Sequence, residues 1–251
     1  PLEDIMFRNK NTPESIFEVQ RTYTAGGLAV TTNVAAITTP SHNGKGIYDG
    51  VEIPDMGTAM TTWTSMRPNS YFCDGLQTKK GNDKRKTLNM AWEYNGKPFS
   101  NVGTRPWLGP KFWCPGMQNT ADFTNQKVFR YADAILMMSE CYAEQENVDE
   151  SIRYLNMVKE RAGITPYVFK NMESLKEEIQ KERGRELIGE FQRKFDLVRW
   201  GIWYQMTYDY TNYATLKDNM LPCHEYYPIP DKEVVYSGGA LDNKAYNEYG
   251  M

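Results

Sequence analysis

Apolar and polar positions alternate with the period of an α-helix in the second half of the chain. Apolar side chains recur every three to four positions through VFRYADAILMMSECYAEQE, which begins at Val128. This spacing gives a helix one apolar face. Three later stretches repeat the pattern, so the predicted helices cover residues 128–146, 147–162, 172–189 and 192–208.

The spacing of these helices predicts two consecutive hairpins. Asn147 offers an N-cap, with Glu150 three residues on as in a capping box, and Gly163 supplies a C-terminal stop. The two pairs begin about 44 residues apart and have short connections, as in helical repeats. After about residue 210 the pattern becomes irregular, and YYPIP cannot be helical through its prolines.

Residues 1–127 have a different composition and are predicted to be rich in loops. They hold 12 of the 19 glycines and nine of the 13 prolines, and turn dipeptides such as Asn43-Gly44 and Asn95-Gly96 interrupt every periodic run. Only EDIMF and ESIFEVQ predict short elements there. Four of the six tryptophans also lie in this part, which favours a functional surface over a disordered one. We therefore divide the chain into a loop-rich, aromatic-rich region (1–127) and a helical region (128–251), and predict a mainly α fold with little β.

Charge and cysteine content exclude several classes of protein. The net charge is −3 and the basic residues do not gather into a run, so nucleic acid is not an expected partner, because phosphate binding needs a concentrated basic patch. No apolar run approaches the roughly 18 residues of a membrane helix. The four cysteines lie far apart in the sequence, and their spacing matches neither a zinc site nor a disulfide framework.

Charge is densest in QKERGRELIGEFQRKFDLVRW, residues 180–200, where ten of 21 residues are charged. The apolar stripe through Leu175 and Ile179, continued by helical steps, reaches Glu182, Glu186 and Glu190. These carboxylates therefore point toward the interior, where a charge must be paired, protonated or bound to a metal.

Three interpretations of these carboxylates are open: an ion-pair lock, a metal site, or a catalytic pair. Carboxylate metal sites in helical bundles usually add a Glu-x-x-His from each of two helices, whereas His42 and His224 lie outside the predicted helices. Positive charge is already at hand, since Arg183, Arg185, Arg193 and Arg199 lie in the same stretch. We therefore favour the ion-pair lock, with Arg199 in a stabilising role, and predict neither a metal site nor a catalytic residue.

The same stretch resembles the SusD/RagB family, glycan-binding lipoproteins of outer-membrane nutrient-uptake systems. Its motif runs Glu182-Arg183-x-x-Glu186-Leu187, then Glu190-x-x-Arg193, then DLVRWG from Asp196. Other motifs similar to the family's follow the family's order along the whole chain: ESIFEVQ (14–20), DKR (83–85), KFW (111–113), RYADAILMMSECYAE (130–144), YLNMVKERAG (154–163), PIPDKE (228–233) and LDNKAY (241–246). The chain departs from the pattern at Phe191, where the family usually has glycine, and at Lys244-Ala245, which replaces Asn-Pro or Pro-Gly.

The resemblance implies a SusD-like fold of tetratricopeptide-like helix pairs. Family members are about twice as long, so this chain resembles their C-terminal half. The resemblance therefore implies that the family's N-terminal tetratricopeptide-like half, which carries the lipid-anchoring cysteine and part of the glycan site, is absent from this chain. The resemblance also implies that the absent repeats pack against helix 128–146, which would leave an apolar face exposed in this chain.

A glycan site would lie in the loops after ESIFE, which the resemblance implies to be the variable glycan surface. A pyranose needs an aromatic platform with polar groups around it. The candidates chosen on this chemistry are Tyr48, Trp63, Arg67, Asn69 and Tyr71. The alternative is that each packs its own loop against the helices. Weaker candidates are Trp92, Trp107 and Trp113, whereas Trp200, Trp203, Cys223 and His224 are interpreted as structural.

The leading functional hypothesis is non-catalytic glycan capture at the outer-membrane surface. The resemblance implies a TonB-dependent transporter of the SusC type as partner and a lipid anchor outside this chain, with no cofactor. One alternative is a glycoside hydrolase, which needs two carboxylates facing each other across a cleft. Another is a helical-repeat scaffold that binds protein.

Overall fold

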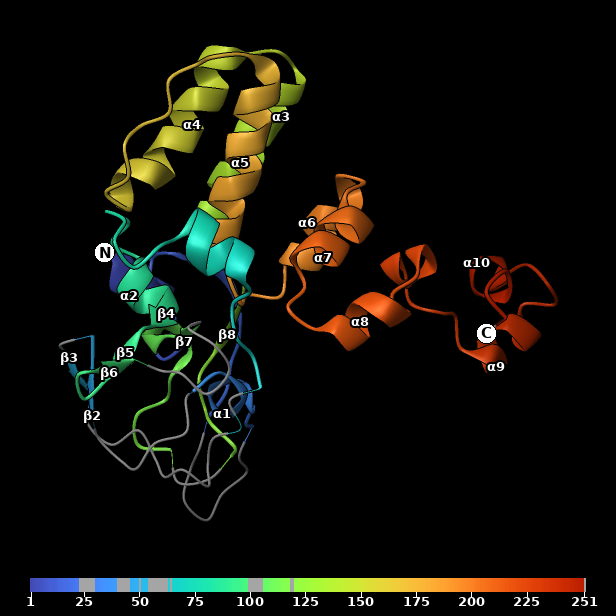
Figure 1. The fold of residues 1–251 in the computed structure, drawn as a ribbon, viewed down its shortest axis with the longest axis horizontal. Coiled ribbons are helices and arrows are strands. Elements are labelled where there is room, and N and C mark those ends of the chain that lie inside the picture. Colours follow the sequence, from blue (N-terminus) through green and yellow to red (C-terminus); the bar gives the residue numbers. More distant parts are fainter. Residues whose placement is uncertain are drawn as a thin grey trace. The chain divides into compact units, whose positions relative to one another are not determined.

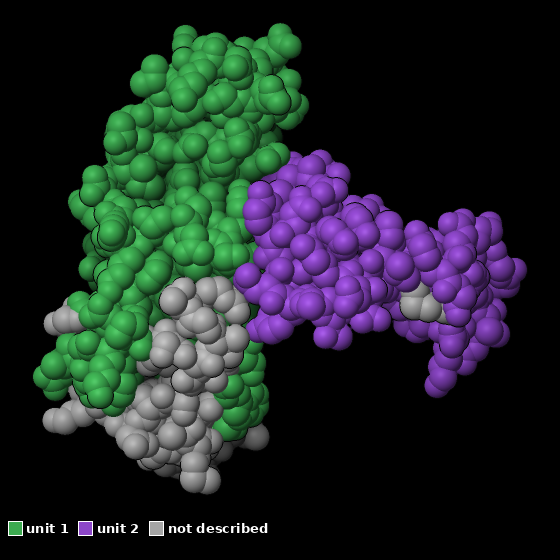
Figure 2. Space-filling view, in the orientation of Figure 1, with its two compact units in different colours: residues 1–193 green, residues 194–251 purple. Residues whose placement is uncertain are grey.

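The structure, a computed structural model, describes residues 1–22, 30–39, 46–49, 51–53, 63, 65–98, 106–117 and 120–250; the predicted Asn43-Gly44 turn lies outside them. The chain forms two compact units, residues 1–193 and 194–251 (Figure 2). This division does not follow the change in composition at residue 127. Strand β8 (Gln126–Arg130) spans that point and pairs antiparallel with β1 (Ser15–Val19). Helices dominate and the strands are short, so the predicted mainly α class is confirmed.

Three helices lie side by side in unit 1 (Figure 1). They are α3 (Tyr131–Glu144), α4 (Val148–Arg161) and α5 (Met172–Glu186). Their apolar stripes meet in a core of Ala132, Ile135, Leu136, Ala143, Leu155, Val158, Leu175 and Ile179. The predicted start of α4 is confirmed, because the Asn147 side chain accepts a hydrogen bond from the Glu150 amide (3.4 Å).

The predicted boundaries were wrong at three places. The first helix begins at Tyr131, because residues 126–130 form β8. The third ends at Glu186, and a turn that includes Gly189 with a positive φ of 71° follows it. The fourth is two helices, α6 (Arg193–Arg199) and α7 (Trp203–Tyr210), separated at Gly201 with φ 70°. A glycine in the left-handed region is a common helix terminator.

The loop-rich region carries small sheets and short helices. EDIMF contributes to a 3-10 turn (Leu2–Ile5) and ESIFEVQ contains β1. The Asn95-Gly96 turn is confirmed: both residues have positive φ (49° and 74°), as a type I′ hairpin requires. One sheet has the order β3-β2-β5-β6, formed by Val51–Ile53, Gly46–Tyr48, Glu93–Tyr94 and Lys97–Pro98. The remaining elements of this region are β4 (Met90–Ala91), paired with β7 (Trp107–Leu108), α1 (Val34–Thr38), α2 (Lys86–Asn89), a π-helical turn (Tyr71–Leu76) and a 3-10 turn (Pro110–Phe112).

Unit 2 begins inside α6 and consists of short helices and turns. The sequence pattern missed those beyond residue 210, because four to six residues are too few to show a helical period. No helix in the described part of the chain is long and apolar enough to cross a membrane. The elements beyond residue 210 are α8 (Ala214–Asn219), a 3-10 turn (Pro222–Glu225), α9 (Asp231–Tyr236) and α10 (Lys244–Asn247).

Candidate functional site

A buried ion-pair network surrounds the carboxylates of α5. Glu182 and Glu186 are fully buried and Glu190 is 4 % exposed, so the helical stripe correctly predicted their direction. Glu186 binds Arg85 (2.6 Å), Arg161 (2.6 Å) and Arg130 (2.9 Å). The pairing of these carboxylates with basic side chains confirms the predicted ion-pair lock. The other short pairs of the network are Arg85–Glu182 (2.7 Å), Arg85–Asp83 (2.8 Å), Arg130–Glu14 (2.7 Å), Arg130–Glu190 (2.7 Å), Arg161–Glu14 (2.8 Å), Lys111–Glu190 (2.5 Å) and Arg185–Glu182 (2.8 Å).

The cations of this network were predicted from the wrong part of the chain. We expected the arginines of 180–200 to supply the positive charge. Arg185 does so for Glu182, but the cations bound to Glu186 come from Arg85, Arg130 and Arg161. Arg183 lies one residue from Glu182, about 100° around the helix, and pairs instead with Asp133 of α3 (2.8 Å). Arg199 pairs with Asp196 (3.0 Å) at the surface of α6, with its side chain 43 % exposed, so it is not part of the buried lock.

Electrostatics keep the network ionised despite its burial. Burial alone would raise the pKa of Glu186, but Arg130, Arg85 and Arg161 outweigh it and hold this pKa well below its ordinary value. The pKa of Glu190 is lowered in the same way by Arg130 and Lys111. Burial lowers the pKa of Lys111 to about 8, although Glu190 opposes this shift.

The network is suited to joining elements and not to chemistry. Lys111 donates to the carbonyls of Glu186 (3.0 Å) and Ile188 (3.2 Å), and Arg130 donates to the Glu186 carbonyl (3.0 Å). These bonds fix the turn after α5 against the loop-rich region. Arginine forks satisfy the carboxylate oxygens that a metal or a substrate proton would need. Within the described ranges, no group of three or more His, Cys, Asp or Glu side chains could hold a metal ion.

A second buried cluster lies between β1 and β8. Lys127 donates to Glu18 (2.5 Å) and to Ser15 Oγ (2.9 Å), and Asn125 donates to Glu18 (2.7 Å). Burial would raise the pKa of Glu18, but the hydrogen bonds from Lys127, Ser15 and Asn125 lower it to about 2. The Lys127 ammonium thus joins the Glu18 carboxylate and the Ser15 hydroxyl in one buried hydrogen-bonded cluster.

Tyr48, the first predicted glycan contact, is a core residue in this chain. It is 2 % exposed and packs with Ala91, Trp107 and Trp113, its ring centroid 4.6 Å from that of Trp113. Burial raises the pKa of its phenol. The ring therefore presents no face for a sugar. The error arose because the loop-rich sequence has no period to reveal an inward side chain, whereas β2 turns every second residue inward.

Trp63 and Arg67 are more accessible than Tyr48. Trp63 is 50 % exposed, and its amide donates to the Ala36 carbonyl of α1 (2.7 Å), which fixes its backbone. Arg67 lies half-buried with its guanidinium carbon 4.0 Å from the centroid of the Trp107 ring. Trp107 itself is 4 % exposed and belongs to the Tyr48 cluster. The structure thus brings Arg67 over that cluster through Trp107, a residue that we ranked only as a weak candidate.

Asn69 and Tyr71 lie at the start of the π-helical turn. The Asn69 side chain accepts a hydrogen bond from the Phe72 amide (3.1 Å), so it contributes to the local backbone structure. Tyr71 is half-buried. Glycan binding by Trp63, Arg67, Asn69 and Tyr71 stays a prediction, and Trp63 has the most exposed ring of the group.

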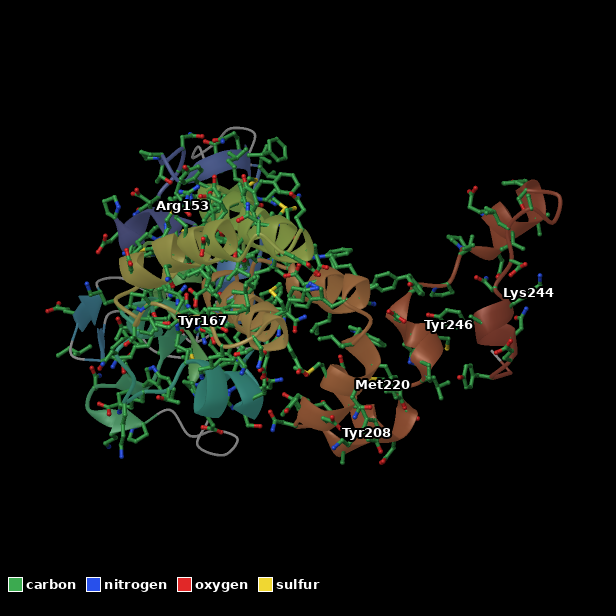
Figure 3. The ribbon with its side chains drawn as sticks, turned by 90° about the horizontal axis from the view of Figure 1, so that it is seen from above. Arg153, Tyr167, Tyr208, Met220, Lys244 and Tyr246 are labelled. Carbon is green, nitrogen blue, oxygen red and sulfur yellow. The ribbon has the colours of Figure 1, made fainter. Side chains whose placement is uncertain are left out.

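Trp113, a weaker glycan candidate, and several residues interpreted as structural have structural contacts. Trp113 is fully buried and its indole donates to the Leu108 carbonyl (3.1 Å). Cys223 is buried, and His224 Nδ1 accepts a hydrogen bond from the Leu221 amide (3.2 Å). In unit 2, cations lie over aromatic rings. These contacts include Lys194 with Trp203 and Tyr227, Arg199 with Trp200, and Lys217 with Tyr208. Tyr246 of α10, labelled in Figure 3, donates to the Tyr226 carbonyl.

Comparisons with known proteins agree with this architecture. The chain is 33 % identical over 174 residues to the SusD-like protein P25 of Formosa agariphila, an alignment that covers 66 % of this chain and 32 % of that protein. It superposes on a SusD superfamily protein of Bacteroides vulgatus with a TM-score of 0.63 and 25 % identity, covering 92 % of this chain and 52 % of the other.

A third similar structure is surface glycan-binding protein A of Bacteroides thetaiotaomicron in complex with laminarihexaose. Its TM-score is 0.63 at 18 % identity, over 96 % of this chain and 54 % of that one. The chain therefore spans about a third of the curated relative and about half of these solved structures. Residues 111–246, more than half of the chain, match the SusD family. The protein belongs to the SusD family.

Proposed function

We propose that this protein binds glycan chains without cleaving them, at the cell surface, and passes them to a SusC-like TonB-dependent transporter. The observation that carries the proposal is the half-exposed ring of Trp63, a residue of the loop-rich region whose backbone amide is bonded to α1. Membership of the SusD family, and the laminarihexaose complex of a structural neighbour, support glycan as the class of ligand. The transporter partner, the outer-membrane location and a lipid anchor outside these residues are part of the proposal.

The chemistry of Trp63, Arg67 and Tyr71 supports a shallow platform. An indole face packs against the C–H groups of a pyranose, while a guanidinium and a phenol donate to its hydroxyls. Trp63, Arg67 and Tyr71 supply these groups within nine residues of sequence. In this proposal Tyr48 does not contact the sugar. It packs with Trp107 in the buried cluster, and Arg67 contacts the Trp107 ring.

A glycoside hydrolase is the weaker candidate. Such enzymes need two carboxylates on opposite sides of the scissile bond, about 5–5.5 or 6.5–9.5 Å apart and open to substrate. The dense carboxylates of this chain are instead buried and paired with arginines. Their pairing favours capture over catalysis.

The substitution Trp63→Ala tests the platform. Stacking of an aromatic side chain is worth about 1–3 kcal/mol by analogy with nucleobases, so this change should weaken polysaccharide binding about 5- to 150-fold. Binding is measured as retardation in native gels cast with laminarin, starch or xylan. Trp63→Phe, which keeps a ring face, should retain most of the binding.

Tyr213→Ala serves as the matched control, because Tyr213 of unit 2 is 58 % exposed and lies outside the proposed platform. It should leave retardation unchanged. The proposed platform is refuted if Trp63→Ala leaves retardation intact but lowers the melting temperature as a core substitution would.

A further inference from the structure

The short helix α1 connects a buried carboxylate to the backbone of Trp63. A helix leaves the amides of its first turn and the carbonyls of its last turn without partners inside the helix. At the first turn of α1, the Ala35 amide donates to Asp122 Oδ2 (2.8 Å). Toward its end, the Ala36 carbonyl accepts from the Trp63 amide (2.7 Å). Asp122 and Trp63, 59 positions apart in the chain, are thus bonded to adjacent residues of one helix.

Asp122 is itself held firmly in place. It is fully buried, and its Oδ1 accepts from both the amide (2.9 Å) and the hydroxyl (2.6 Å) of Thr124. Its backbone pairs with that of Thr32, two residues before α1, through hydrogen bonds of 2.8 and 2.7 Å. One carboxylate oxygen therefore serves the segment of Asp122 itself, and the other is left to hold α1.

The packing of α1 does not by itself determine where its carbonyls point. The helix has only five residues, too few to be stable on its own. Ala35 and Ala36 are small and pack in a buried cluster that includes Met117, and apolar contacts of this kind are not directional. The hydrogen bonds at its two ends therefore fix its position.

The Trp63 ring depends on this position because its side chain is 50 % exposed. Its backbone holds it instead, and a second amide of the same segment repeats the contact: Met66 donates to the Ile37 carbonyl of α1 (2.9 Å). Two consecutive carbonyls of α1 thus carry the segment that presents the ring. A movement of α1 would change both bonds together.

We propose that Asp122 is a positioning residue for Trp63, because it holds the first turn of α1 and thereby the carbonyl to which Trp63 is bonded. The inference rests on the proposed function, in which Trp63 provides the main aromatic contact with the glycan. Asp122 is buried and does not touch the sugar. It raises affinity by keeping the ring ordered before binding, since ordering a loop on binding costs free energy.

Hydrogen exchange of single amides tests the link without any ligand. In the wild-type 251-residue chain, the Ala35 and Trp63 amides should open with the same free energy, because one movement of α1 breaks both bonds. In Asp122→Asn, the two donors of Thr124 hold the single acceptor oxygen, so the NH2 group turns toward the Ala35 amide. This variant should speed exchange at Trp63 by about tenfold or more.

Two control variants separate positioning from a general loss of stability. Thr124→Val removes a hydroxyl that donates to the same carboxylate but leaves the bond to Ala35 in place. Leu136→Ala opens a cavity in the core of α3, α4 and α5, which does not include α1 (Figure 1). Both should leave exchange at Trp63 unchanged.

Three results of the exchange measurements would overturn the inference. They are unequal opening free energies at Ala35 and Trp63 in the wild type, unchanged exchange at Trp63 in Asp122→Asn, and an equal effect of Thr124→Val. The first needs no variant, so the inference can fail even where Asp122→Asn does not fold.

Retardation in native gels cast with laminarin tests the consequence for binding. Asp122→Asn should weaken retardation by about fivefold or more, and should add nothing in a Trp63→Ala background, because it acts only through that ring. An equal loss in both backgrounds would overturn the inference. Absence of retardation of the wild type on laminarin, starch and xylan would instead overturn the proposed function and with it the role of Asp122 in binding. The exchange measurements distinguish the two failures, since they need no glycan.

Discussion

Three arginines surround the buried carboxylate of Glu186. Its side chain is fully buried, and Arg85, Arg130 and Arg161 all bind it within 2.9 Å. Removing one member of such a group leaves buried cations without their counter-charge. That loss costs far more than the net strength of any single pair.

We therefore predict that Glu186→Ala lowers the free energy of unfolding by about 3–5 kcal/mol. Chemical denaturation measures the difference. Glu177→Ala is the control, since Glu177 forms an exposed pair with Lys181 on the same helix, and should cost less than about 1 kcal/mol. A Glu186→Ala protein that unfolds like the wild type but no longer retains glycan would contradict the structural role.

The same residue shows how far sequence alone can lead. The stripe through Leu175 and Ile179 predicted that Glu186 faces inward, because helical geometry is local and periodic. Its partners Arg85 and Arg130 lie 101 and 56 residues away. A local sequence pattern cannot predict pairing over such distances, so we assigned the pairing cations to the arginines nearby in the sequence. Tyr48 was misplaced for the same reason, since its burial depends on Trp113, far along the chain.

At the scale of elements, the turn between α5 and α6 depends on two residues with left-handed backbone. Gly189 has φ 71°, and an added Cβ would lie 2.4 Å from the Phe112 ring. Phe191 has φ 66°, a conformation that costs a residue with a Cβ about 1–2 kcal/mol. The turn thus has glycine where glycine is required and phenylalanine where glycine would also fit.

Opposite effects are expected from exchanging these residues. Gly189→Ala should destabilise the protein by about 2 kcal/mol or more, from backbone strain and the clash with buried Phe112. Phe191→Gly should be neutral or stabilising by up to about 1 kcal/mol, since relief of strain outweighs the added freedom of the unfolded chain. Melting curves of both variants test this, with Phe195→Gly, inside α6, as the destabilising control. If Phe191→Gly is as harmful as that control, the ring and not the backbone determines the turn.

Longer elements were easier to predict than short ones. The periods of α3, α4 and α5 continue over 14 or 15 residues, so each stripe was visible. Helices such as α9, with six residues, show less than two turns and no usable period. The strand β8 was mistaken for the start of a helix because Val128 and Tyr131 fit the helical stripe, whereas pairing with β1 decides the backbone.

Across the whole molecule, buried carboxylates link stability to pH. The pKa of Glu18 is lowered to about 2, and those of Glu186 and Glu190 are also lowered. A carboxyl whose pKa is lower in the folded state binds fewer protons there than in the unfolded chain. Its stabilising effect is therefore complete above the unfolded pKa of about 4.3 and is lost as the pH falls toward the folded pKa.

The expected result is a free energy of unfolding that is steady from pH 7 to about pH 5 and falls steeply between about pH 4.3 and pH 2. Urea denaturation at fixed ionic strength and several pH values measures this profile. A flat profile down to pH 2 would contradict the account, because it would mean that the pKa values of these carboxyls are not lower in the folded state than in the unfolded chain.

The central claim is that this SusD family protein captures glycan and does not cleave it. The most direct measurement incubates the 251-residue chain with defined polysaccharides, laminarin among them, and follows retention of the protein and release of reducing sugar in the same sample. We predict retention on at least one polysaccharide with no product above the protein-free control, and loss of that retention in Trp63→Ala. Release of reducing sugar by the wild-type chain, or no retention on any polysaccharide, would contradict the claim.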